Sequence, residues 1–338
     1  MQVTIHSSAS IFETLHPEWN PLLGQSITNS FFLTWEFQKT WWDHFGGGQH
    51  LQVVSARDEA GRLIGLAPLY LTHSEGEAHH LRIIGGIDVA DYLDWLALRG
   101  QEQAILAALF AAICDQTPYP WTLLDLRPLP AATPTRALLP ALAEARGFHV
   151  AACLSDVCPI IELPPTFEAY LESLDKKQRH ELRRKMRKAH SDADVRWHVV
   201  GADHDLARAM DDFIALHQSS SAGKDDFMTP LMKDFFQALA RAAYDAGWLE
   251  LAFVEFNGRP AATYLNFAYD RNTLVYNSGF DPQAYSLLSP GIVLLTHLIE
   301  RAIQNGHQRF DFLRGDEVYK FRMGAKPTEV HQLAISRT

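Results

Sequence analysis

The sequence predicts an α/β (α+β) fold made of two similar domains, residues 1–160 and 161–338. An order of hairpin, strand, helix and strand occurs twice along the chain, and both hairpin turns carry a Gly-Arg pair, at residues 61–62 and 258–259. With 338 residues the chain is long enough for two domains of ordinary size. A helical segment separates the two repeats and is expected to connect the domains.

In the first domain, β-rich segments at residues 51–56 and 63–72 flank the polar turn "RDEAGR" and predict a hairpin. The stretches "HLRIIGG" and "DYLDWLAL" are further strand candidates. The stretch "GQEQAILAALFAAICDQ" then predicts a helix, and "WTLLDLRPL" predicts the strand after it.

The second domain repeats this order. Residues 249–270 predict a strand, a turn and a second strand, and "TLVYNSGF" predicts a third. The helix "PGIVLLTHLIERAIQNG" is expected to end at Gly306, before the short strand "RFDFL".

The connecting segment is helical. Asp175 and Gln178 form a capping box that begins a helix at about residues 175–190. A helical insertion at about residues 204–247 contains two helical stretches. The polar sequence between them, "QSSSAGKDDFMT", is predicted to be a mobile loop.

Composition bounds the class of protein. A formal net charge of −10 argues against a protein that coats nucleic acid, and we expect no DNA partner. Three cysteines without metal-type pairing predict reduced thiols and a cytoplasmic location, and the histidines show no metal-binding spacing, so no metal is expected. No signal peptide is recognised at the N-terminus, and the apolar stretch at residues 104–114 is too short to span a bilayer.

Basic residues are concentrated in "KKQRHELRRKMRKAH" at residues 176–190, where eight of fifteen positions are Lys or Arg. One interpretation is an anion-binding face for a nucleotide-linked substrate, an RNA or an anionic membrane surface. The alternative is a solvated helix face without a ligand. Composition alone leaves both open.

Ser289 is predicted to cap a helix that has Pro290 at its first position. The free N–H groups and the dipole of such a terminus suit a phosphate or pyrophosphate. The alternative is a well-capped helix without a ligand, because Gly291 alone is not a glycine-rich loop and the chain has no Walker motif.

The stretch "FDFLRGDEVYKFRMGA" places many ionisable groups after a short strand. Alternation puts Asp311 on the face opposite Phe310 and Phe312. Carboxylates at a strand end could deprotonate a substrate amine, and Tyr319 or Lys320 could donate a proton or pair with an anion. The alternative is a salt-bridged turn.

The sequence resembles the CelD/BioF-like acetyltransferases of the GNAT superfamily, which are akin to the Fem-type aminoacyl transferases of peptidoglycan synthesis. The stretches that carry this resemblance are "FFLTWEFQKTWWDHF", "GRLIGLAPLYL", "YLESLDKKQRHELRRKMRKA", "YNSGFDPQAYSLLSPGIVLL" and "FDFLRGDEVYKFRMGA". The resemblance extends from Phe31 to the end of the chain. The basic helix and "GDEVYK" are its most specific parts.

This resemblance implies tandem GNAT-like domains, each with a mixed, mainly antiparallel sheet flanked by helices. It also implies transfer of an acyl group from acetyl-CoA or another acyl-CoA to an amine or hydroxyl. The parts that match the cofactor-binding strand and helix N-terminus contain Asn277, Ser278, Gly279, Ser289, Pro290 and Gly291. The usual GNAT Q/RxxGxG/A loop is missing.

The roles assigned on this basis are those of a direct transfer in a ternary complex. Asp311 or Asp316 would act as the base, backbone N–H groups of residues 277–279 would stabilise the oxyanion, and Tyr319 would protonate the leaving thiolate. Lys320 would bind an anionic part of the acceptor. A phosphate-bearing acceptor would be attracted by the basic residues Lys177, Arg179, Arg183, Arg184 and Arg314.

The acceptor class stays open at this stage: a small-molecule or glycan-type acceptor such as an amino sugar, nucleotide sugar, polysaccharide precursor or small amine. One alternative function is a Fem-like transferase that uses aminoacyl-tRNA. Another is a non-enzymatic protein of an exopolysaccharide system that binds an anionic polymer or makes peripheral contact with a membrane surface.

Overall fold

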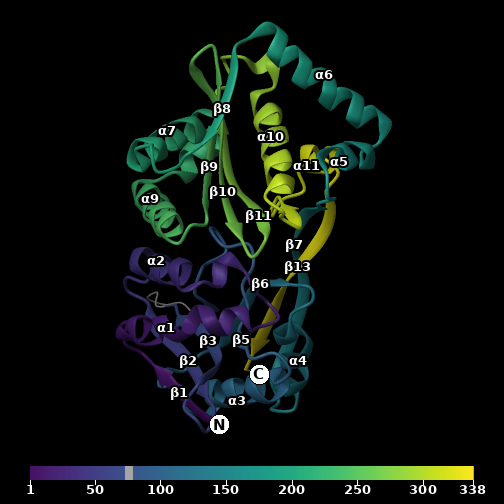
Figure 1. Cartoon of the computed structure of the whole chain (residues 1–338). Coiled ribbons are helices and arrows are strands. Elements are labelled where there is room, and N and C mark those ends of the chain that lie inside the picture. Colours follow the sequence, from purple (N-terminus) through teal and green to yellow (C-terminus); the bar gives the residue numbers. More distant parts are fainter. Residues whose placement is uncertain (73–78, 338) are drawn as a thin grey trace. The chain divides into compact units, whose positions relative to one another are not determined.

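The computed structural model describes residues 1–72 and 79–337. The chain divides into two compact units. Unit 1 contains Met1–Asp156 and Glu329–Thr338, and unit 2 contains Val157–Thr328. Figure 1 labels the helices and strands of both units.

Unit 1 is built on one mixed sheet with the strand order β1-β2-β3-β4-β6-β13. Its strands are β1 (Gln2–His6), β2 (His50–Arg57), β3 (Leu63–Leu71), β4 (His80–Ile83), β6 (Leu123–Pro130) and most of β13 (Lys326–Ser336), with β5 (Leu96–Ala97) paired to β3. Only β4 and β6 are parallel among these recorded pairs. The helices are α1 (Ser10–Gly24), η1 (Phe31–Leu33), α2 (Trp35–Phe45), α3 (Glu102–Asp115) and α4 (Pro134–Glu144).

In unit 2 the sheet has the strand order β7-β12-β11-β10-β9-β8. Its strands are β7 (His149–Glu162), which begins in unit 1, β8 (Val195–Val199), β9 (Leu249–Phe256), β10 (Arg259–Tyr269), β11 (Asn272–Phe280) and β12 (Arg309–Asp311). The helices are α5 (Phe167–Ser173), α6 (Lys176–Asp192), α7 (Leu206–Ser219), α8 (Ala222–Phe227), α9 (Pro230–Asp245), η2 (Ser286–Leu288), α10 (Pro290–Gln304) and α11 (Val318–Arg322).

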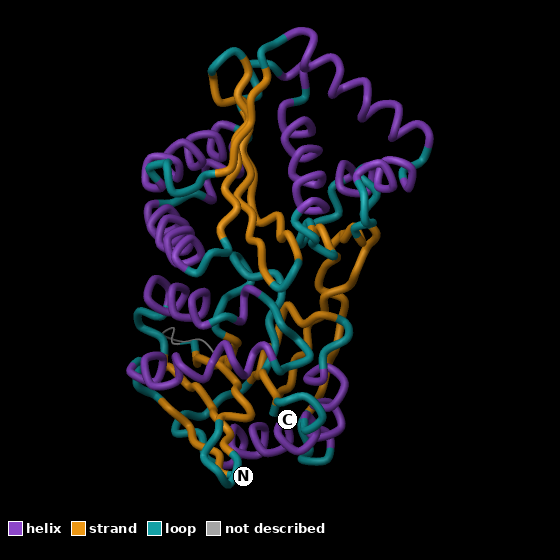
Figure 2. Tube along the Cα trace, viewed as in Figure 1, coloured by secondary structure: helices purple, strands orange, loops and turns teal. Residues whose placement is uncertain are grey.

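Antiparallel pairs dominate in this unit's part of the sheet as well. Among its recorded pairs, only β11 and β12 are parallel. Helices cover both of its faces: α7 and α9 lie on one side and α10 on the other (Figure 2). The predicted fold class, mixed and mainly antiparallel sheets flanked by helices, is confirmed.

Helix α10 is the central core helix of unit 2. Nine of its fifteen residues are buried, and they pack with the inner face of β9, β10 and β11. Within the described residues, Ser286–Gln304 is long and apolar enough to cross a membrane by length and composition alone. Burial against the sheet accounts for this apolar composition.

Two local predictions at helix starts had different outcomes. Asp175 caps α6 as expected, because its carboxylate accepts the N–H groups of Lys177 and Gln178, both at 2.9 Å. Ser289 precedes α10 but has left-handed backbone angles, φ 53° and ψ 55°, and its side chain makes no capping hydrogen bond. The predicted serine cap was therefore wrong: the side chain of an Ncap residue reaches the first N–H groups from an extended backbone.

The segment predicted to be a mobile loop is partly helical. Residues 222–227 form α8, and the Ser221 hydroxyl caps it by accepting the N–H of Lys224 at 3.3 Å. The polar composition of this segment concealed the helix, because α8 is only six residues long and has no apolar periodicity.

Candidate functional site

The sheet of unit 2 opens between two neighbouring strands. The parallel strands β11 and β12 pair only where residues 272–274 face Arg309–Asp311. β12 then ends, and the chain continues toward β7, where the N–H of Phe312 donates to the carbonyl of Pro159 at 2.9 Å. β11 runs on to Phe280, so its later residues have no recorded strand partner on this side.

The far end of this edge is closed by the side chain of Ser220, the residue directly after α7, and by a side chain from α8. The hydroxyl of Ser220 accepts the N–H of Phe280 at 2.9 Å. The Lys224 ammonium donates to the carbonyl oxygen of Ser278. The stretch of β11 between the two closures, residues 275–277, is called the open edge below. An extended ligand with amide groups could add to it as a strand would.

A bulge marks the open edge. The pairing of β11 with β10 shifts so that Leu265 faces Asn277 while Asn266 faces Val275, and Tyr276 is the extra residue between them. Bulges bend a strand locally and often accompany functional sites. Here the bulge lies where β11 loses contact with β12.

The other face of β11 is packed tightly against α7. The imidazole Nε2 of His217 lies 3.0 Å from the amide oxygen of Asn277. A Cβ on Gly279 would lie 2.4 Å from the backbone nitrogen of His217 and 2.5 Å from the carbonyl carbon of Leu216, so only glycine fits. Burial, then the charge of Lys224, lowers the pKa of His217 to about 4, so this imidazole is neutral at physiological pH.

The N-terminus of α10 offers a free donor. The carbonyl of Ser289 accepts the N–H groups of Ile292 and Val293 at 3.0 and 3.1 Å. Within the described chain, the N–H of Gly291 has no recorded acceptor. The Tyr264 hydroxyl lies 3.9 Å from the Cβ position of Gly291, so a phenol and a free helix-terminal N–H adjoin each other.

A cleft of about 960 Å³ lies beside this terminus. It is lined by Lys176, Lys177, Gln178, Arg179, His180, Glu181, Leu182, Arg183, Lys185 and Arg187 of α6, by Ile292 of α10, and by Tyr319, Arg322 and Met323 at α11. We call it the basic cleft. Because Ile292 belongs to the first turn of α10, the cleft and the helix N-terminus are neighbours.

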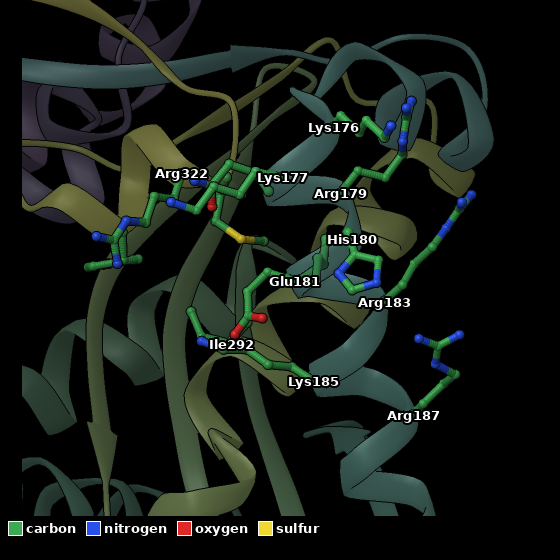
Figure 3. Close-up of a pocket in the computed structure, with 14 residues that line it drawn as sticks. Lys176, Lys177, Arg179, His180, Glu181, Arg183, Lys185, Arg187, Ile292 and Arg322 are labelled. Atoms are coloured by element: carbon green, nitrogen blue, oxygen red, sulfur yellow. The ribbon is translucent and has the colours of Figure 1, made fainter.

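Both flanks of α6 contribute charge to the cleft. Figure 3 shows Lys177 and Glu181 on the side of α6 nearer Arg322, with Arg179 and Arg183 on the other side. Seven Lys or Arg residues line the cleft against one carboxylate, that of Glu181.

These charges are largely unneutralised. Glu181 is held by Arg184, at 2.7 Å, and Arg183 pairs with Glu168 at 2.8 Å. Within the part of the chain that the structure describes, the other six basic residues of the cleft have no recorded ion pair. The cleft is therefore suited to a ligand with several negative charges.

Tyr319 connects the basic cleft with the core. Its ring meets that of Phe312 edge-on at 6.0 Å and also lines the cleft. Burial, and then the Glu317 carboxylate, raises the pKa of Tyr319. Burial also raises the pKa of Tyr264. Both phenols keep their protons at neutral pH and can donate hydrogen bonds.

Lys320 is buried and engaged. Its ammonium donates to the carbonyl oxygens of Arg314 at 2.7 Å and Gly315 at 3.1 Å, with that of Leu313 at 3.4 Å, and pairs with the Glu317 carboxylate at 2.9 Å. These contacts hold the turn that leads into α11. The predicted role in binding an acceptor would require the ammonium to leave them.

The two predicted bases lie away from the basic cleft. Asp311 is buried in β12, and its carboxylate accepts the N–H of Leu313 at 2.8 Å. Asp316 is exposed in the turn before α11. Glu317 follows Asp316 directly. Its carboxylate acts electrostatically on Lys224, which lies at the far end of the open edge. Glu317 is not among the site residues predicted from the sequence.

Of the predicted site residues, the basic cleft brings together Lys177, Arg179, Arg183 and Tyr319. Outside its lining lie Arg184, Asn277, Ser278, Gly279, Ser289, Pro290, Gly291, Asp311, Arg314, Asp316 and Lys320. Within the described residues, no group of three or more His, Cys, Asp or Glu side chains could hold a metal ion.

The corresponding region of unit 1 is occupied by its own chain. β4 and β6 are also a short parallel pair, but β4 ends at Ile83. Beyond it, the N–H of Leu93 donates to the carbonyl of Pro128 in β6 at 2.8 Å. An open edge next to a basic cleft is thus a feature of unit 2.

Comparison with known proteins agrees with this location. Residues 176–321, within unit 2, match the family model described as "Acetyltransferase (GNAT) domain". Unit 2 therefore carries a GNAT-type acetyltransferase domain. No curated protein matches the chain.

Solved structures share the fold at low sequence identity. FemX superposes with a TM-score of 0.68 at 11% identity, covering 98% of this chain and 97% of its own. The C-terminal domain of a putative lysylphosphatidylglycerol synthetase from Agrobacterium fabrum has a TM-score of 0.57 at 10% identity, with 98% and 92% covered. L-PGS from Bacillus licheniformis has a TM-score of 0.55 at 10% identity, with 95% and 91% covered. The whole chain is thus Fem-like in fold.

Proposed function

We propose that unit 2 transfers an acyl group from acyl-CoA, acetyl-CoA or a longer thioester, to an amine or hydroxyl of an acceptor. The observation that carries this proposal is the open edge of β11 beside the free N-terminus of α10, within the residues that match the GNAT domain. The amide groups of the donor's pantetheine arm would bond to residues 275–277 as an added strand. The donor's pyrophosphate would meet the N–H of Gly291 and the positive end of the α10 dipole.

The basic cleft would hold the remaining donor phosphates. From the sequence, Lys177, Arg179 and Arg183 were predicted to attract a phosphate-bearing acceptor. Ile292, in the first turn of α10, lines the same cleft, which favours the donor's phosphates instead. Arg322 would join them from α11.

The reaction is a direct transfer. The acceptor amine attacks the thioester carbon, the C–N bond forms and the C–S bond breaks. The departing thiolate takes up a proton and leaves as the thiol. Holding both reactants in one site supplies much of the rate enhancement, since effective molarities of about 10⁵ M or more are reached in well-oriented systems. Tyr319, kept protonated by burial, would donate to the thiolate. Glu317 would take the proton of the acceptor in place of Asp311, whose carboxylate already accepts a backbone N–H.

We further propose an assignment to the CelD/BioF-like enzymes. On it, the acceptor is an amino sugar, a nucleotide sugar, a polysaccharide precursor or a similar small molecule, and the protein acts in the cytoplasm. The resemblance of the basic helix and of "GDEVYK" to that group supports this assignment.

Titration with CoA, acetyl-CoA and longer acyl-CoAs tests the donor, by thermal shift and calorimetry. A ligand that binds only the folded protein raises its apparent stability. We expect Lys177→Ala with Arg322→Ala to weaken CoA binding about 10- to 100-fold, because two phosphate contacts are lost. Lys233→Ala in α9 is the matched control and should bind normally. No shift with millimolar acyl-CoA would rule out this donor.

Measurement of kcat tests the assignment of Tyr319 as the proton donor. Tyr319→Phe removes only the hydroxyl and should lower kcat about 100-fold at unchanged CoA affinity, which is the scale of general acid catalysis. An unchanged kcat in Tyr319→Phe would remove this assignment.

A second candidate donor is aminoacyl-tRNA. It is favoured by the whole-chain similarity in fold to FemX and by the six unpaired cations of the cleft. Filter binding of tRNA against salt separates the two donors. Binding that falls steeply with salt and is lost in Lys177→Ala with Arg322→Ala, together with no response to acyl-CoA, would establish tRNA as the donor.

A further inference from the structure

The Lys224 ammonium lies at the end of the open edge. α8 carries it there, and it donates to the Ser278 carbonyl with the Ser278 hydroxyl oxygen at 3.5 Å. An ammonium has three donors. At least one N–H therefore stays available next to residues 275–277. Lys224 is outside the lining of the basic cleft, so its charge is separate from that group of cations.

This charge is not balanced by a neighbouring carboxylate. Within the described residues, Lys224 has no ion pair within 4.0 Å. The carboxylate that acts on it electrostatically, Glu317, is paired with Lys320 at 2.9 Å. The neighbouring His217 is uncharged at neutral pH. Charges removed from water are normally paired, because leaving one uncompensated costs several kcal/mol.

We propose that Lys224 binds an anionic group of the acceptor, a carboxylate or a phosphate, and so selects acceptors that carry one beside the reacting amine or hydroxyl. This inference rests on the proposed acyl transfer at the open edge. An anion on Lys224 would place the rest of the acceptor next to residues 275–277, where the thioester would lie, and opposite the N-terminal turn of α11 with Glu317 and Tyr319.

A direct test follows the reactivity of the ammonium and does not need turnover. The protein is labelled with an amine-selective reagent, and the modification of Lys224 is measured by mass spectrometry in inorganic phosphate or acetate, with sodium chloride at the same ionic strength as reference. We expect at least fivefold slower labelling of Lys224 in one of the two anions. Lys233 in α9 should label equally in all three salts. Equal labelling of Lys224 in all three salts would overturn the proposal.

A kinetic test identifies the anionic group. Acceptor probes are used in pairs: glucosamine 6-phosphate against glucosamine, and glycine against glycinamide. Lys224→Met should raise KM about 30-fold for the anionic member of the preferred pair and less than threefold for the neutral one. Lys224→Arg should keep most of the discrimination, and Lys233→Met should keep all of it.

The failures are distinguishable. A loss of kcat in Lys224→Met that is equal for anionic and neutral probes would overturn the proposal, because such a loss would mean that the ammonium acts on the reacting carbonyl and not on an anionic group of the acceptor. The acyl-CoA thermal shift of Lys224→Met should equal that of the wild type, so an absent shift in both proteins refutes the donor. The labelling result decides the anion site whether or not the probes are acylated.

Discussion

Replacement of Lys320 by methionine separates a structural role from a catalytic one. Methionine keeps the long unbranched stem, so the packing of this buried position changes little. It removes the ammonium that donates to the carbonyls of Arg314 and Gly315 and pairs with Glu317. The turn before α11 then loses its central donor.

The magnitude follows from these contacts. A hydrogen bond to a charged group contributes about 1.5–3 kcal/mol, and two such bonds here are 3.1 Å or shorter. The ion pair to Glu317, whose side chain is 58% exposed, adds less than about 1 kcal/mol. We expect Lys320→Met to lower the free energy of unfolding of unit 2 by about 3–5 kcal/mol.

Urea denaturation monitored by circular dichroism measures this loss, with Lys326→Met as the control because Lys326 is exposed. The residual acyl-CoA binding of Lys320→Met should follow the folded fraction. A variant that unfolds within about 0.5 kcal/mol of the wild type, yet has lost turnover, would refute the structural role and restore the catalytic one.

Two further predictions concern the contact between β11 and α7. Gly279→Ala should lower the free energy of unfolding by about 3 kcal/mol, because its Cβ meets backbone that cannot rotate away. The control is Gly223→Ala, where no atom lies within 4 Å, and it should leave the urea midpoint unchanged or slightly higher. An unchanged midpoint for Gly279→Ala would contradict the observed packing. His217 is neutral in the fold down to about pH 4, whereas in the unfolded chain it takes a proton below pH 6.5. The contribution of the neutral imidazole to the free energy of unfolding is therefore complete above pH 6.5 and is lost as the pH falls toward 4. Urea titrations at several pH values should show a loss of roughly 3 kcal/mol over this window that is missing in His217→Gln, and parallel pH profiles for the two proteins would disprove the linkage.

Much of the fold was readable from local sequence. The repeated order of elements predicted the main strands of both units, and "TLVYNSGF" and "PGIVLLTHLIERAIQNG" are β11 and α10 as expected. These predictions succeed because side-chain periodicity and turn residues act over a few positions. The basic character of α6 is likewise a property of the sequence itself.

The candidate site was only partly readable. The sequence selected Lys177 and Tyr319, which line the basic cleft. It overlooked Lys224, Glu317 and Arg322. A polar segment with a single lysine carries no periodic signal, and α8 is too short to produce one.

The sequence by itself determined which elements form and where the positive charge is concentrated. The tertiary structure alone decided what each charge does. Lys224 meets Ser278, 54 residues away, only because α7 packs on β11 at Gly279. Lys320, which reads as a free cation beside exposed residues, is buried by the turn that it holds. The contact of Lys224 depends on the distance between segments that are remote in the chain. The contacts of Lys320 depend on the path of the turn at residues 313–317, and local propensity encodes neither of them.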